Sequence, residues 1–149
     1  MTKIIDINLI ELELDLDNKE SIIRHLAKIM DKNGRLNDIE QYIDSVMERE
    51  ELVSTSVGHG VCIPHGKTDG VRIPSIAFAR TKKKVEWGKG EEDKVNLIFM
   101  IAVPEKFASN DHLKILAALS RKLIDEDFRK RLTIINDKET LIQMLTEVF

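Results

Sequence analysis

The sequence predicts an α/β fold, a single-domain sandwich with a mixed central β-sheet and helices on both of its faces. Helical periodicity occurs in residues 18–52 and again after residue 108, and short runs with strand character lie between these regions. Residues 95–103 are apolar apart from Asn96, which is typical of a central strand covered on both faces. Helices before and after such strands favour layers of helices packed on a sheet.

The N-terminal part predicts one strand and two helices. Residues 9–14 alternate apolar and acidic side chains, as a half-buried first strand does. Asp17 or Asn18 can cap the following helix, and Gly34 marks its end. A second helix begins near Asn37. The apolar stripes of the two helices comprise Ile22, Ile23, Leu26, Ile29 and Met30, and then Ile39, Tyr42, Ile43, Val46 and Met47.

The middle of the chain predicts short strands. Residues 61–63 form one that ends at Pro64, because proline has no N–H to donate to a sheet ladder. We expect Gly66 to let the backbone turn sharply after it. Residues 75–81 and 85–87 read as two further strands, which precede the central one.

Three helices are expected to close the chain. Ser109 or Asn110 caps the first, Asp125 caps the second, and Asn136 with Glu139 makes a start like a capping box for the third. The predicted stripe of the first of these helices comprises Leu113, Leu116, Ala117, Leu123 and Ile124.

Composition narrows the class of protein. The chain of 149 residues is 42% hydrophobic and 33% charged, which predicts one globular domain over residues 1–149. Its net charge of -3 argues against a general nucleic-acid binder. No apolar run approaches the roughly 20 residues of a membrane span, and the N-terminus carries no signal-peptide core. The single cysteine, Cys62, excludes an internal disulfide, so we expect a cytoplasmic protein.

His65 is the leading candidate for a reactive group. It follows a strand that stops at Pro64, so stiff main chain would hold its ring at the strand tip. Neutral imidazole is nucleophilic near neutral pH when its second nitrogen holds a proton on a fixed acceptor. The alternative interpretation is a histidine that only closes a strand end.

The segment Gly58-His59-Gly60-Val61-Cys62-Ile63-Pro64-His65-Gly66-Lys67 looks like the signature of a known family. Further matching elements are Arg49, Val85-Glu86-Trp87-Gly88, the run 95–103 closed by Pro104, and His112-Leu113 followed by Leu116. The sequence resembles the fructose/mannitol family of IIA domains of the bacterial sugar phosphotransferase system, PTS EIIA type 2.

The resemblance implies an α/β fold and a phosphoryl carrier. His65 would take a phosphoryl group through Nε2 from the phosphohistidine of HPr and pass it to a cysteine of a IIB protein or domain. A membrane IIC permease would then take up the sugar, which this domain need not contact. No cofactor, metal or nucleic acid is implied, and no segment would enter the membrane.

His112 and Arg49 complete the candidate catalytic set. With Ser109 as N-cap, His112 lies in a first helical turn, where free N–H groups and the helix dipole favour a phosphoryl group. The guanidinium of Arg49 can grip phosphoryl oxygens through two parallel hydrogen bonds. The alternatives are an exposed His112 without a role, and a surface ion pair between Arg49 and the glutamates at positions 48, 50 and 51.

Two other functions stay open at this point. A regulatory, nitrogen-type relative would use the same histidine to signal to a partner protein instead of serving sugar transport. A metal-dependent hydrolase would use His59, His65 and His112, although their spacing matches no known ligand motif. His59 and Cys62 depart from the usual family pattern, and we expect Cys62 to pack as a small hydrophobic residue facing away from the reactive side.

Overall fold

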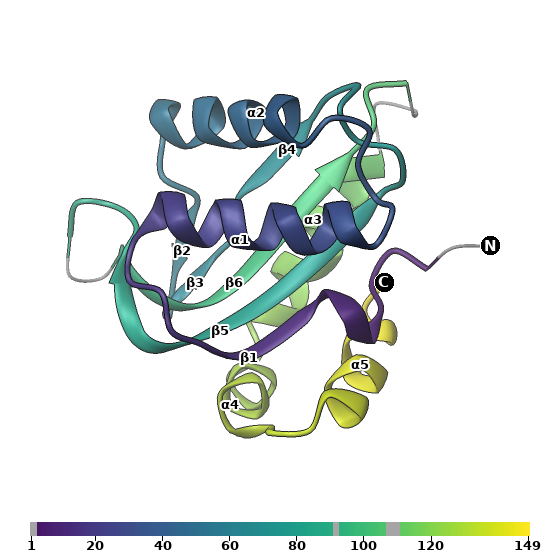
Figure 1. The fold of residues 1–149 in the computed structure, drawn as a ribbon. Helices are drawn as coiled ribbons and strands as arrows, with labels where there is room; N and C mark the ends of the chain where they lie inside the picture. The colour runs from purple at the N-terminus through teal and green to yellow at the C-terminus, as the bar shows by residue number, and fades with distance from the viewer. Residues whose placement is uncertain (1–2, 91–92, 107–110) are drawn as a thin grey trace.

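Two layers of helices enclose a six-stranded mixed sheet (Figure 1). The computed structural model describes residues 3–90, 93–106 and 111–149, with the side chains of residues 111 and 112 left out of that description. The strands are β1 (Ile10–Leu14), β2 (Ser56–Gly58), β3 (Val61–Cys62), β4 (His65–Lys67), β5 (Ser75–Glu86) and β6 (Lys94–Val103). The helices are η1 (Ile7–Leu9), a short 3-10 helix, then α1 (Lys19–Lys32), α2 (Ile39–Leu52), α3 (Asp111–Leu123), α4 (Glu126–Ile134) and α5 (Lys138–Thr146). The predicted α/β sandwich is confirmed.

The strand order is β1-β5-β6-β3-β2, and β4 also pairs with β6. β1 lies parallel to β5, β5 antiparallel to β6, and both β3 and β4 parallel to β6. β6 is therefore central, as its apolar sequence predicted, and its residues alternate between two separate core clusters.

The first helical layer consists of α1 and α2. The side chain of Asn18 accepts a hydrogen bond from the backbone N–H of Ser21 and caps α1. Beyond that helix Gly34 adopts a φ of 73°, a conformation that glycine accommodates without cost. Asp38 caps α2 in the same way through the N–H of Gln41. Both predicted helices are confirmed, and their apolar stripes pack on one face of the sheet.

The second layer consists of α3, α4 and α5, which cover the opposite face. The predicted stripe of α3 is confirmed for Leu116 and Leu123 and is wrong for Leu113, Ala117 and Ile124. Leu119 and Leu123 are buried, whereas Leu113 is 55% exposed and Ile124, just beyond the helix, is 79% exposed. The packed face continues through Ile115 and Leu116, so the true stripe follows spacings of three and four residues from there.

Two further predictions need correction. Residues 75–81 and 85–87 are not separate strands, because β5 continues through the lysines between them with a register shift against β6. The helix α5 is capped by Asp137, whose side chain accepts from the N–H of Glu139. Asn136 instead accepts a 2.9 Å hydrogen bond from Nη2 of the buried Arg80, a long-range contact that local sequence does not reveal. Of the helices described, none is long and apolar enough to cross a membrane.

Candidate functional site

β3 and β4 follow one another along β6, and both pair with it in parallel. Cys62 pairs with Ile98 and His65 with Ile101, so the register on β6 is the same before and after the interruption. Pro64 interrupts the ladder because it lacks an N–H, but its carbonyl still accepts a 2.9 Å hydrogen bond from the N–H of Ile101. The predicted strand tip is therefore wrong, since His65 is the first residue of a resumed strand.

Gly66 is needed for packing rather than for a turn. It lies within β4 and is not among the described glycines with positive φ. A Cβ atom there would lie 3.0 Å from Cγ2 of Val46, and 3.1 Å from both Oγ of Ser45 and Cε1 of Tyr42. Helix α2 thus approaches the backbone beside His65 too closely for any side chain, and the expected sharp turn is wrong.

The ring of His65 is half-buried and held in one orientation. Its partner in register, Ile101, belongs to the core cluster under α3, α4 and α5, so the imidazole leaves the sheet on that face. Nδ1 of His65 lies 2.9 Å from the carbonyl oxygen of Ile63. A carbonyl oxygen only accepts, so this hydrogen bond requires the proton on Nδ1 and leaves the Nε2 lone pair for attack.

Arg49 lies near the C-terminal end of α2, one turn after Ser45 and Val46, which face Gly66. Its Nη1 donates a 2.8 Å hydrogen bond to the carbonyl oxygen of Val53, just past the end of its own helix. Among the described side chains no hydrogen bond joins Arg49 to His65. The guanidinium retains Nε and Nη2 for another partner, since neither makes a hydrogen bond within the described chain.

His112 lies in the first turn of α3, on the layer that covers the same face of the sheet as His65. The predicted caps of this helix, Ser109 and Asn110, lie outside the described residues, and so does the side chain of His112. The role of His112 in holding a phosphoryl group therefore stays a prediction.

His59 and Cys62 have different surroundings. His59 and Gly60 form the two-residue turn between β2 and β3 and have φ angles of 57° and 77°, as a type I′ hairpin turn requires. Cys62 is fully buried, and this burial, reinforced by the negative charge of Glu50, raises the pKa of its thiol well above the ordinary value. Cys62 thus packs as a core residue facing away from His65, as predicted. No group of three or more metal-binding side chains occurs within the described part of the chain.

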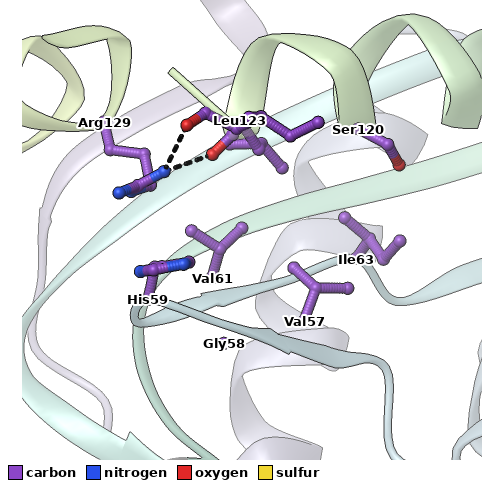
Figure 2. Close-up of a pocket in the computed structure, with 9 residues that line it drawn as sticks. Val57, Gly58, His59, Val61, Ile63, Ser120, Leu123 and Arg129 are labelled. Atoms are coloured by element: carbon purple, nitrogen blue, oxygen red, sulfur yellow. Dashed lines mark hydrogen bonds between the residues drawn. The ribbon is translucent and has the colours of Figure 1, made fainter. Parts of the chain in front are cut away.

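A cavity of about 360 Å³ lies beside β3, between the β2–β3 turn and the region that joins α3 to α4 (Figure 2). Its lining comprises Val57, Gly58, His59, Val61, Ile63, Ser120, Leu123, Ile124 and Arg129. Nη1 of Arg129 donates to the carbonyl oxygens of Leu123 and Ile124, at 2.5 and 3.1 Å. Val57 and Ile124 remain 49% and 79% exposed, so the face of the sheet onto which His65 projects carries accessible apolar surface.

Residues 3–148 match the family model described as "Phosphoenolpyruvate-dependent sugar phosphotransferase system, EIIA 2". The chain belongs to this EIIA family. A fructose-specific EIIA component from Haloferax volcanii is 38% identical to this EIIA chain over 148 residues, which cover 99% of the chain and 96% of the relative. A fructose-specific EIIABC component from Bacillus subtilis is 35% identical over 147 residues, and this EIIA chain spans 23% of that longer protein.

Solved structures agree with the EIIA fold. The nitrogen regulatory protein IIA-Ntr from Neisseria meningitidis has a TM-score of 0.86 at 28% identity, covering 95% of this EIIA chain and 96% of the other. IIA mannitol from Escherichia coli has a TM-score of 0.81 at 25% identity, covering 94% and 97%. The fold is therefore shared with both IIA mannitol and a nitrogen regulatory protein.

The sequence interpretation missed the role of Glu50 in this EIIA chain. The sequence offered it only as an alternative surface partner of Arg49, but it is 6% exposed and its carboxylate lies among polar groups inside the protein. A signal was present, because position 50 follows Val46 by four residues and so continues the buried stripe of α2. A glutamate on an apolar stripe indicates a buried carboxylate with dedicated partners.

Proposed function

We propose that this protein is a phosphoryl carrier of a sugar phosphotransferase system and works in the cytoplasm. Nε2 of His65 accepts the phosphoryl group from the phosphohistidine of HPr and passes it to a cysteine of a IIB protein or domain. A IIC permease uses that phosphate in sugar uptake. The observation that carries the proposal is the 2.9 Å contact between Nδ1 of His65 and the carbonyl oxygen of Ile63, in a chain of the EIIA family.

The chemistry fits this geometry. In the first transfer the phosphorus–nitrogen bond on HPr breaks while a bond to Nε2 of His65 forms, and Nδ1 keeps its proton throughout. Little covalent work remains for the protein beyond positioning and stabilising charge. We assign the charge stabilisation to Arg49, through the N–H groups that Val53 does not use, and to His112 at the start of α3.

A donor or acceptor protein must dock on the face that carries His65. The cavity beside β3 and the exposed side chains of Val57 and Ile124 provide apolar surface there, and Arg129 and His59 lie at the same end of the cavity (Figure 2). Apolar centres with arginine at the edge are typical of protein interfaces. We therefore propose that this surface contacts HPr and IIB in turn.

Fructose is the sugar that the comparisons favour. Two relatives with 38% and 35% identity are named as fructose-specific, and the longer one is an EIIABC component. We propose that this chain serves a fructose-type system, with IIB and IIC functions supplied by partner domains.

Reconstituted transfer tests the proposal. The protein is incubated with labelled phosphoenolpyruvate, enzyme I and HPr, and we expect one phosphate per chain that is labile in acid and stable in base. His65→Ala, checked for folding by circular dichroism, should take no label. Chase with a fructose-type IIB should remove the label from the parent protein. A fully labelled His65→Ala protein would refute the assignment.

A regulatory function is the second candidate, because IIA-Ntr from Neisseria meningitidis gives a TM-score of 0.86. In that case His65 would still be phosphorylated, but IIB would not discharge it. Capture of a partner protein that depends on the phosphorylation state, together with failure of the IIB chase, would favour this alternative.

A further inference from the structure

Glu50 is a buried carboxylate with three donors. Its side chain is 2% exposed and accepts from Nζ of Lys19 at 2.9 Å and from the backbone N–H of Thr55 at 3.2 Å. Oγ1 of Thr55 donates a further short hydrogen bond to the second carboxylate oxygen. The end of α2, the start of α1 and the chain leading into β2 therefore meet at one carboxylate.

Trp87 also contacts the cluster formed by Glu50, Lys19 and Thr55. Its Nε1 donates a 3.3 Å hydrogen bond to Oγ1 of Thr55, and Nζ of Lys19 lies 5.3 Å from the centroid of its ring. The hydroxyl of Thr55 thus donates to Glu50 and accepts from Trp87 at the same time. Thr55 is held through both its side chain and its backbone, and it is only 4% exposed.

Thr55 connects this cluster to His65. The carbonyl oxygen of Thr55 accepts a 3.1 Å hydrogen bond from the N–H of Ile63. The carbonyl oxygen of Ile63 is the acceptor for Nδ1 of His65, at 2.9 Å. Because Pro64 follows, the backbone of Ile63 is restricted to extended conformations, so fixing its N–H also limits where its carbonyl can point.

We propose that Glu50, together with Lys19, is a positioning residue for the reactive imidazole. The carboxylate holds Thr55, Thr55 holds the peptide chain at Ile63, and Ile63 fixes the Nδ1–H tautomer of His65. The inference rests on the proposed role of His65 as phosphoryl acceptor and deepens it.

Stability alone gives a weaker account of the cluster. A buried ion pair is often no better for folding than apolar residues of similar volume, because its desolvation offsets its attraction. Both oxygens of Glu50 accept from Thr55, and Oε1 also accepts from Lys19, so the carboxylate orients the chain that precedes β2.

The test compares Glu50→Gln with Glu40→Gln. Glu40 is the matched control, since its carboxylate also joins α2 to α1, through a 3.3 Å contact with Arg24, but it is exposed and has no contact with Thr55. The first readout is the 15N NMR spectrum of the neutral His65 ring in the unphosphorylated protein. The second is the phosphoryl transfer rate at saturating phospho-HPr, with the KM for phospho-HPr measured separately.

We expect a single Nδ1–H tautomer in the parent and in Glu40→Gln, and a mixture of tautomers in Glu50→Gln. The maximal transfer rate of Glu50→Gln should fall about threefold to tenfold, as loss of one orienting hydrogen bond allows, with the KM unchanged. The double variant Lys19→Met with Glu50→Leu removes both charges together, so that neither is left buried and unpaired, and it should show the same two changes.

A single Nδ1–H tautomer with the parental rate in both Glu50 variants would overturn the inference. That result is distinct from failure of the proposed function, in which the parent protein itself takes no label on His65.

Discussion

The hydroxyl of Tyr42 donates a 2.9 Å hydrogen bond to the carbonyl oxygen of Ile101, the residue paired with His65 in the sheet. Tyr42 lies on α2 and is fully buried, so this polar contact joins the helix to the central strand directly beside His65. The same helix presses against Gly66. The backbone of β4 is therefore fixed by β6 on its inner side and by α2 across the sheet face.

Tyr42→Phe should lower the free energy of unfolding by about 1–3 kcal/mol, because the carbonyl oxygen of Ile101 loses one buried donor. Urea unfolding at pH 7 measures the change. The dependence of the free energy of unfolding on alkaline pH gives a second test of Tyr42. Burial raises the pKa of Tyr42 well above its ordinary value, so the folded protein keeps a proton that the unfolded chain loses above about pH 10.

Ionisation of Tyr42 should therefore give the free energy of unfolding of the parent no pH dependence below about pH 10, and should make it fall as pH rises beyond that value. Cys62, whose raised pKa acts in the same direction, is present in both proteins and cancels in the difference. An equal alkaline fall in Tyr42→Phe and the parent would show that Tyr42 is not the responsible group.

Gly66→Ala should lower the free energy of unfolding by about 1–3 kcal/mol, since the new methyl group would overpack the contact with Val46, Ser45 and Tyr42. Ser45→Ala in the same chain removes one of the three crowding atoms and should recover part of the loss. Thermal and urea unfolding measure both variants. A Gly66→Ala protein as stable as the parent would contradict the close approach of α2.

Arg49→Ala should slow phosphoryl transfer about a hundredfold, the usual scale for removing one donor that stabilises developing charge. His112→Ala should act in the same direction. Rapid-quench transfer from phospho-HPr measures the rate, and Arg24→Ala is the control, because Arg24 is a partly exposed arginine on α1 that pairs with glutamates. Parental rates in the Arg49 and His112 variants would remove both residues from the site.

Ile124→Glu should raise the KM for phospho-HPr about tenfold without changing stability, because the side chain is 79% exposed and lines the cavity beside β3. Ile134→Glu is the matched control, since Ile134 is 70% exposed but does not line that cavity. Equal KM values for the two variants would place the docking surface elsewhere.

Much of the fold was predictable because local signals agree with tertiary packing. The caps of α1 and α4 are an asparagine and an aspartate at the expected positions, and the central strand was evident from its apolar run. The wrong predictions concern features that contacts between residues distant in the sequence determine. Asn136 is engaged by Arg80, so Asp137 caps α5 instead. The lysines after Thr81 remain in β5 because this strand pairs with β6 on both sides of them, at Arg80 and again at Val85 after a register shift.

The sequence pointed to His65 as the candidate residue, but it did not predict the backbone and side chains that hold this ring. The pattern around Pro64 indicated His65, but pairing to β6 continues beyond the proline, and single-sequence patterns do not show such parallel pairing. Close packing, rather than φ, explains Gly66. The burial of Glu50 was missed because its neighbours Glu48, Arg49 and Glu51 suggested a surface, while only its position on the stripe of α2 indicated burial.

The shared register of β3 and β4 on β6 makes the orientation of His65 depend on the length of this segment. Loss or gain of one residue between Cys62 and His65 would invert every later side chain in the strand. The imidazole would then turn toward α2, where even a methyl group is crowded, and its exit toward a partner would be closed. The spacing from the hairpin to the histidine should therefore tolerate substitution far better than insertion or deletion.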